Sequence, residues 1–330
     1  MNRIKRSGKL LKAAFAVLFR EQKLLLFPLV ASVLAFAVAL FFIAPVVLYP
    51  TGHSVFTAEH WSALAERAGH WFNLEAMHDQ HGHPVAGMQK SGLQLLAGHP
   101  WTMLALTLLY FISMFLATFS NVAFYHEIMR ALNGDVVSIR RGYQFAASRW
   151  RMVLLWSLFA GLVGYVIQTI QERMGFLGRI VTGLIGFAWS AACIFIIPTI
   201  VQDKETSNPL KLLNNSVGTL RRTWGETIVG FAGIGILSAL AVFTVVIGIL
   251  LAIAYPMVVL AAPNSGLNPH RLLFVPAIMV LIAVVAATAL SYMGGMINSI
   301  YRCALYIYAT EGVVPGTFDK ELLDSAWKVK

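Results

Sequence analysis

The sequence predicts an all-α integral membrane protein with six transmembrane helices arranged as three hairpins. The first observation is that six segments contain no Asp, Glu, Lys or Arg, and the shortest of them is 20 residues long. A helix of about 20 apolar residues crosses the hydrocarbon core of a bilayer. The second observation is the composition, 58% hydrophobic and 12% charged, which excludes a soluble multidomain protein and a disordered chain. The uncharged segments are 24–58, 91–126, 152–171, 180–202, 227–270 and 272–301.

The third observation is the placement of the basic residues, which sets the orientation. The spans are expected at 24–48, 100–125, 152–170, 180–201, 228–254 and 272–301. One side then carries 20 of the 25 Lys and Arg residues. By the positive-inside rule this side is the cytoplasm. We therefore predict a multi-pass protein of the inner (cytoplasmic) membrane with both termini in the cytoplasm.

Residues 1–330 are expected to form a single membrane domain, because no Pro-, Gly- or Ser-rich linker interrupts the chain. Residues 1–23 are expected to form a cytoplasmic amphipathic helix, residues 49–98 an external segment, and residues 311–330 a cytoplasmic tail. The formal charge of +10 follows from this topology and from attraction to anionic lipid. The expected partners are thus membrane lipids, through their anionic headgroups on the cytoplasmic side, and not nucleic acid. Oligomer formation is left open.

Three cytoplasmic segments that precede the first, third and fifth spans resemble one another. They align without gaps at offsets of 135 and 74 residues, which superposes Phe15, Trp150 and Trp224. Their apolar positions recur at the spacing of one helical face. Each segment is therefore predicted to be a basic amphipathic helix in the membrane interface, with its aromatic residue where the chain enters the bilayer. The cations expected to bind lipid headgroups are Arg6, Lys12, Arg140, Arg141, Arg221 and Arg222.

This alignment also predicts the symmetry of the fold. Each unit would consist of one interfacial helix and one hairpin, and the three units would share one orientation. Repeats of the same orientation are related by an axis along the membrane normal, so a pseudo-threefold bundle is expected. The alternative is that the segments are alike only because cytoplasmic loops of membrane proteins are commonly basic and amphipathic.

The last span carries a small residue at every fourth position. Such a stripe lets a neighbouring helix backbone approach closely, which is the favoured interpretation, and a groove for a lipid tail is the alternative. The stripe consists of Ala283, Ala287, Ser291, Gly295, Ser299 and Cys303.

Four polar residues are expected at membrane depth, namely Asn121, Gln168, Ser190 and Asn298. A polar side chain in hydrocarbon is costly unless it is paired, so these side chains should point inward. Single interhelical hydrogen bonds are the simplest role for them. A translocation or headgroup path is the alternative.

A distinctive motif surrounds the end of the fourth span. It consists of Pro198, Asp203, Asn208-Pro209-Leu210-Lys211, Ser216 and Leu220-Arg221-Arg222-Thr223-Trp224-Gly225-Glu226. Together with Arg3-Ile4-Lys5-Arg6-Ser7 and Leu25-Leu26-Phe27-Pro28, it resembles an uncharacterised family of bacterial and archaeal multi-pass membrane proteins. More distantly, it is similar to the membrane domain attached to some glycerophosphodiester phosphodiesterases. The resemblance implies the six-helix architecture and no activity, because the chain has no phosphodiesterase catalytic domain.

The external segment 49–98 contains an expected amphipathic helix, Glu59 to Leu74, and a histidine cluster. His78, His81 and His83 offer three imidazoles to Zn²⁺, Cu²⁺ or Ni²⁺. The alternative is a solvated polar turn, which the nearby Gly82 and Pro84 favour. No other cofactor is expected.

The sequence contains no paired carboxylates within a span and no glycine-rich phosphate loop, so we expect no enzyme activity. The leading hypothesis is a lipid-interacting scaffold or accessory protein, based on the basic interfacial segments. The first alternative is a transporter or permease with a path between the hairpins, lined by Asn121 and Asn298. The second is a metal-binding membrane protein that uses the external histidines.

Overall fold

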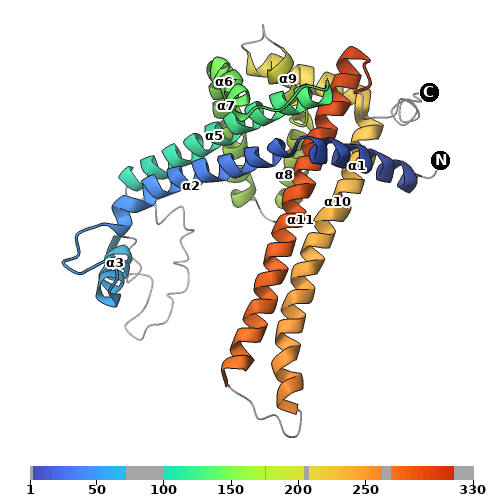
Figure 1. The fold of residues 1–330 in the computed structure, drawn as a ribbon. Coiled ribbons are helices and arrows are strands. Elements are labelled where there is room, and N and C mark those ends of the chain that lie inside the picture. Colours follow the sequence, from blue (N-terminus) through green and yellow to red (C-terminus); the bar gives the residue numbers. More distant parts are fainter. Residues whose placement is uncertain (1–2, 72–99, 175, 204–207, 262–268, 316–330) are drawn as a thin grey trace.

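The computed structural model describes residues 3–71, 100–174, 176–203, 208–261 and 269–315 (Figure 1). All regular secondary structure in these ranges is helical. The elements are α1 (Arg3–Arg20), the 3₁₀ turn η1 (Gln22–Leu25), α2 (Leu26–Val47), α3 (Ala58–Trp71), α5 (Pro100–Leu132), α6 (Ile139–Ser148), α7 (Trp150–Arg173), α8 (Phe176–Ala192), α9 (Ile196–Gln202), α10 (Pro209–Ala261) and α11 (Pro269–Glu311).

Five helical segments in the described ranges are long and apolar enough to cross a membrane. They coincide with the first four and the sixth of the expected spans. The expected fifth span, 228–254, lies inside α10, where Ala239–Tyr255 is the described apolar stretch. The prediction of a helical membrane protein is confirmed at this level. The five segments are Gln22–Val47, Met103–Leu132, Trp150–Gln171, Gly178–Gln202 and Phe274–Glu311.

Long helices that follow one another in the chain pack together: α2 on α5, α7 on α8, and α10 on α11. Figure 1 shows the pair α2 and α5 leaving a shared end of the molecule in a different direction from the pair α10 and α11. No more than 22% of the apolar window of any of the five segments is buried inside the protein. Their remaining apolar surface is suited to contact with lipid tails.

The hydrophobic core lies at the shared end, which we call the core end. There α5 continues to Leu132 and α11 to Glu311, beyond the expected span ends at 125 and 301. These extensions pack against α1, α6, α9 and the first turns of α10. The largest fully buried side chains of the core are Phe27, Phe195, Leu18, Leu24, Ile128, Ile196, Ile200, Leu212, Met296, Ile297, Ile300 and Leu305.

The three segments that align in the sequence enter their spans differently. η1 separates α1 from α2, and the single residue Arg149 separates α6 from α7. In contrast, α10 runs without a break from Pro209 through Trp224 to Ala261. The first turns of α10 pack in the core through the buried side chains of Leu212 and Leu220. The third aligned segment and the span that follows it are therefore parts of one helix.

One member of the stripe of small residues, Ala283, makes a close contact between α11 and α10. A Cβ atom added at Gly248 would lie 2.2 Å from the Cβ of Ala283, which is too close for any two carbon atoms. The two helices therefore approach as closely as glycine allows, as the favoured interpretation of the stripe expected.

Replacing Gly248 with Ala should lower the unfolding temperature of the protein. The added methyl group must push α10 and α11 apart, and overpacking of this kind costs about 1–3 kcal/mol. Unfolding can be followed in detergent with a thiol-reactive dye, because Cys193 and Cys303 are free thiols. The matched control is Gly183→Ala on α8, where an added Cβ meets nothing within 4 Å. Equal unfolding temperatures for the two variants would contradict the close contact.

Candidate functional site

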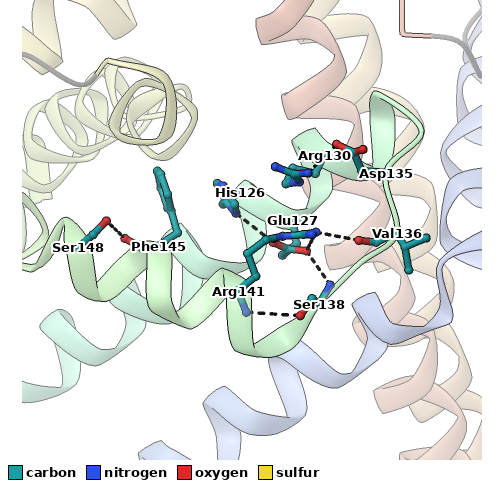
Figure 2. Close-up of polar contacts among 9 residues, drawn as sticks. All are labelled: His126, Glu127, Arg130, Asp135, Val136, Ser138, Arg141, Phe145 and Ser148. Atoms are coloured by element: carbon teal, nitrogen blue, oxygen red, sulfur yellow. Dashed lines mark hydrogen bonds and ion pairs between the residues drawn. The ribbon is translucent and has the colours of Figure 1, made fainter.

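A buried carboxylate near the end of α5 organises the polar structure at the core end. The side chain of Glu127 has no exposed surface, and Arg141 of α6 binds both of its oxygens. Arg141 Nε donates to Oε1 at 2.9 Å, and Arg141 Nη2 donates to Oε2 at 2.6 Å. Figure 2 shows the two side chains pointing toward each other from α5 and α6. This geometry is the bidentate pairing that suits a guanidinium and a carboxylate.

The turn between α5 and α6 supplies further partners to this pair (Figure 2). The backbone N–H of Ser138 donates to Glu127 Oε2 at 2.7 Å, and His126 Nδ1 lies 3.1 Å from Oε1. Ser138 also caps α6, since its side chain accepts from the Arg141 N–H. Arg141 Nη2 donates in addition to the carbonyl of Val136 at 2.7 Å. The buried charge is therefore fully hydrogen-bonded, as a stable buried ion pair requires.

Gly142 brings α6 close enough for this pairing. A Cβ added there would lie 2.9 Å from the Ala123 carbonyl oxygen and 3.0 Å from Glu127 Cγ. The hydrogen bond with Glu127 raises the pKa of the Arg141 guanidinium above its ordinary value. Arg141 was expected to bind lipid headgroups, and that role remains untested. The structure gives its guanidinium two partners inside the protein.

Replacing Glu127 with Gln should destabilise the protein strongly. The change leaves Arg141 without its counterion, but the Arg141 side chain is 36% exposed, so the loss should be that of hydrogen bonds to a charged group, about 1.5–3 kcal/mol. Titration with SDS in detergent micelles measures the loss. The matched control is Asp135→Asn, which breaks the 3.0 Å pair of Arg130 and Asp135, whose side chains are 41% and 49% exposed. That exposed pair should contribute less than about 1 kcal/mol. Similar losses in both variants would show that Glu127 holds no special position.

A pocket of about 510 Å³ opens between α2, α5 and α11, and we call it the serine-lined pocket. Its floor is aromatic, with Phe27 and Phe124, and its walls carry small residues and hydroxyl groups. Three members of the α11 stripe line it, so the stripe serves both a helix contact and a pocket wall. The polar and small residues lining it are Ala31, Ser32, Ala35, Ser113, Ala117, Ser120, Asn121, Ser291, Gly295 and Ser299.

Two buried hydroxyl groups near this pocket have no hydrogen-bond partner among the described residues. The first is Ser120 Oγ, in a lining residue that is only 4% exposed. The second is the hydroxyl of Tyr143, whose ring stacks on the lining residue Phe27. An unpaired buried hydroxyl costs about 1–3 kcal/mol. Of these two residues, Ser120 lines the serine-lined pocket, so its hydroxyl is the candidate donor to an occupant there.

A second pocket, of about 490 Å³, lies between α9, α10 and α11 at the core end, and we call it the amide pocket. Every residue that lines it is polar except Gly218. Asp203, which belongs to the motif at the end of the fourth expected span, accepts a hydrogen bond from Asn215 Nδ2 at 3.3 Å. The lining residues are Thr199, Gln202, Asp203, Asn214, Asn215, Gly218, Thr219, Arg222, Tyr306 and Thr310.

Arg149 approaches Asp203 from outside the amide pocket. Its Nη2 donates to the main-chain carbonyl of Asp203 at 2.7 Å. Desolvation lowers the pKa of Arg149, and the nearby charge of Asp203 acts in the opposite direction. Arg149 therefore ties the junction of α6 and α7 to the end of α9.

The sequence repeat relates one partner of Glu127 to one partner of Asp203. At the 74-residue offset, Arg141 corresponds to Asn215. Arg141 binds Glu127 at the end of α5, and Asn215 binds Asp203 at the end of α9. The acidic residues themselves are not at equivalent positions, since Glu127 corresponds to Val201 at this offset, and Asp203 also interacts with the Arg149 guanidinium.

The predicted interfacial residues differ in how far their side chains are exposed. Phe15 is half-buried and stacks on Phe19, whereas Trp150 is 49% exposed with the Arg151 guanidinium over its ring. The side chains of Arg6 and Trp224 lie outside the described residues. The exposed predicted cations are Lys12, Arg140, Arg221 and Arg222.

Of the four predicted intramembrane polar residues, Asn298 is half-buried and accepts a hydrogen bond from Arg302 Nε at 3.2 Å. Asn121 lines the serine-lined pocket. Gln168 and Ser190 are exposed, contrary to the expectation that they point inward.

The histidines proposed as metal ligands, His78, His81 and His83, lie outside the described residues. Within the described ranges, no group of three or more His, Cys, Asp or Glu side chains is placed to hold a metal ion. The expected helix of the external segment is present as α3, which ends at Trp71. Metal binding through the three histidines therefore stays a prediction.

Glu127 is the residue that sequence reasoning missed. It directly follows the uncharged segment 91–126 and lies between the second and third expected spans, where the sequence gives no direct sign of a buried carboxylate. The available signal was its distance of 14 residues from Arg141 across a turn that contains Gly134. Gly134 has a φ of +92°, which favours glycine and lets the chain reverse there.

Comparison with known proteins identifies one related group. A family model described as a family of unknown function (DUF6159) matches residues 101–316, which are 216 of the 330 residues. No curated protein and no solved structure matches the chain. The match agrees with the resemblance to an uncharacterised family. It shows neither the expected bacterial or archaeal membership nor the expected similarity to the membrane domains of glycerophosphodiester phosphodiesterases.

Proposed function

The chain belongs to this family of unknown function, DUF6159, and we propose that it is a non-enzymatic, lipid-binding accessory protein of the inner membrane. The proposal rests on the serine-lined pocket, which lies between helices of membrane-spanning length. In such a position the surrounding medium is hydrocarbon, and an unpaired hydroxyl has no water to bind. The occupant must therefore be apolar enough to enter from hydrocarbon and must accept a hydrogen bond from the hydroxyl. A lipid meets both requirements, because its tail fills the apolar part of the pocket and its ester oxygens accept hydrogen bonds.

Ser120 is the residue that best distinguishes this occupant from a simple hydrocarbon chain. Its hydroxyl is buried and can donate one hydrogen bond. Exposed Asn121 next to it provides a further donor from its amide group. The pocket volume is within the range of about 300–1,000 Å³ that is usual for ligand sites.

The exposed cations support attachment to anionic lipid. Lys12, Arg140 and Arg221 are exposed on helices that meet at the core end. A cation next to an anionic leaflet contributes about 1 kcal/mol of binding free energy. With the core end toward the cytoplasm, these residues lie at headgroup level and both termini are cytoplasmic.

The helix contacts support a pseudo-threefold arrangement of six spans as part of this proposal. The interfacial segment of each unit packs on the second span of the preceding unit: α6 on α5, the start of α10 on α9, and α1 on α11. The elements that end the three second spans, α5, α9 and α11, also contact one another. A closed ring of equivalent contacts is the pattern that three hairpin units of one orientation would make.

The orientation predicts the behaviour of reporter fusions in a bacterial host. A fluorescent protein fused after Lys330 should fold and emit light, and a phosphatase that is active only outside the cytoplasm should be inactive there. The same phosphatase inserted after Gly52, between α2 and α3, should be active. The reverse pattern would place the core end outside the cytoplasm.

Filling the serine-lined pocket should release bound lipid. An added Cβ at Gly295 meets nothing within 4 Å, so Gly295→Leu places its side chain in the pocket without a backbone clash. Native mass spectrometry after gentle purification should detect lipid on the natural protein and at least about tenfold less on this variant. Gly183→Leu is the control, because Gly183 has the same open surroundings and does not line the pocket.

Ser120→Ala separates the role of the hydroxyl from that of the cavity. The change removes an unpaired buried group, so the delipidated protein should be equally or more stable. Lipid retention should nevertheless fall, because the hydrogen bond to the ester is lost. Unchanged retention in both Gly295→Leu and Ser120→Ala would rule out the pocket as the lipid site.

A further inference from the structure

The serine-lined pocket is closed at the core end and open farther along the helices. At its core end, the lining residues Phe27, Phe124 and Met296 are buried. Lining residues farther from that end, such as Ala35 and Ser113, are exposed. On that side α2 and α5 part from α11 (Figure 1). An occupant therefore enters between the long helices and cannot extend a bulky headgroup through the core end.

Contacts between opposite walls of the pocket hold this end closed. The hydroxyl of Tyr292, a lining residue of α11, donates to the main-chain carbonyl of Leu25 just before α2. Phe27 of α2 packs on Phe124 of α5, with ring centroids 5.7 Å apart. Both aromatic rings belong to the hydrophobic core. The closed end is thus continuous with the core and offers no route to water.

The lining of the pocket is uncharged. None of the described residues that line it is Asp, Glu, Lys, Arg or His, and its polar groups are hydroxyls and the Asn121 amide. A phosphate group in hydrocarbon needs a cation beside it, because an unpaired charge is costly there. The lining therefore suits an occupant whose polar end carries no charge.

The polar lining can both give and accept hydrogen bonds. The buried hydroxyl of Ser120 supplies an unused donor. Ser32 donates its own proton to the carbonyl of Pro28 at 2.9 Å. Ser299 likewise donates to the carbonyl of Gly295 at 3.0 Å. A hydroxyl has two lone pairs, so these two oxygens remain acceptors toward an occupant. A matching polar end carries both an acceptor and a hydroxyl proton.

We propose that the serine-lined pocket selects a diacylglycerol, an uncharged lipid with two ester groups and one free hydroxyl, over the phospholipids of the bilayer. Its esters accept from Ser120, its hydroxyl donates to a serine oxygen, and its acyl chains leave through the open side. A phospholipid has the same esters, but its charged phosphate replaces the free hydroxyl. This inference rests on the proposed function, because it names the lipid class that the same pocket takes.

The test compares lipids that share one pair of octanoyl chains. They are dioctanoylglycerol, its acetate ester, dioctanoyl phosphatidic acid and dioctanoyl phosphatidylcholine. Native mass spectrometry of the delipidated full chain in detergent measures the occupancy as the lipid concentration is raised. Dioctanoylglycerol should bind at least about tenfold tighter than each of the others. The acetate ester is uncharged and lacks only the free hydroxyl, so it separates the effect of the hydroxyl from that of charge.

A cation placed in the pocket should change this preference. Asn121→Lys puts an ammonium group on an exposed lining residue of α5. Binding of dioctanoyl phosphatidic acid relative to dioctanoylglycerol should then rise at least about tenfold. The matched control is Asn133→Lys, the same change on an exposed residue just after α5 and outside the pocket. This control should leave the preference unchanged.

The failure of this inference is distinguishable from the failure of the proposed function. If phosphatidic acid or phosphatidylcholine binds as tightly as dioctanoylglycerol, and Gly295→Leu removes that binding, the choice of diacylglycerol is wrong and the pocket still takes lipid. Equal binding of the acetate ester, or equal effects of Asn121→Lys and Asn133→Lys, would also overturn the choice. If no lipid binds, or if Gly295→Leu leaves all binding unchanged, both proposals fail.

Discussion

The ion pair between Glu127 and Arg141 is the constraint on which the arrangement of the helices depends. A carboxylate without exposed surface is tolerated only where donors surround it, and here α6 and the turn before it provide them. The pair therefore fixes α6 against α5. Since α5 also contacts α2, α7, α9 and α11, the position of most other helices follows from this one.

The core end and the long helices are stabilised by different forces. At the core end, buried aliphatic and aromatic side chains from α1, α5, α6, α9, α10 and α11 pack as in a soluble protein. Farther along, the helices expose apolar surface, and lipid tails provide no hydrophobic force that would bring them together. Close contacts between small residues hold α10 to α11 there. Where α2 and α5 part from α11, the serine-lined pocket remains.

Much of this fold was predictable from the pattern of charges. A long uncharged, apolar segment is typical of a helix that crosses a bilayer. Five of the six expected spans coincide with apolar helices of that length. The extension of α5 and α11 beyond the expected span ends at 125 and 301 was not predictable in the same way, because their last turns mix polar and apolar residues as an amphipathic loop does. The small residues on α11 predicted a close contact, which Ala283 makes, and three of them line the serine-lined pocket.

The candidate sites were less predictable, because one residue type serves several purposes. Arg141 and Arg222 have the same sequence context as cations that meet headgroups, yet one binds a buried acid and the other lines a pocket. The distinction depends on which acidic residue the neighbouring helix brings near. That information lies in the packing of α5 on α6 and of α9 on α10, and only the three-dimensional structure contains it.

The contact between Gly248 and Ala283 has a mechanical consequence. Two helices joined so closely move as one stiff rod, and α11 contributes Ser291, Gly295 and Ser299 to a pocket whose other walls are α2 and α5. A rod longer than the local hydrocarbon thickness tilts to bury its apolar length. If the long helices cross the bilayer as proposed, such tilting would move the α11 wall relative to α2 and α5 and change the aperture of the pocket with bilayer thickness.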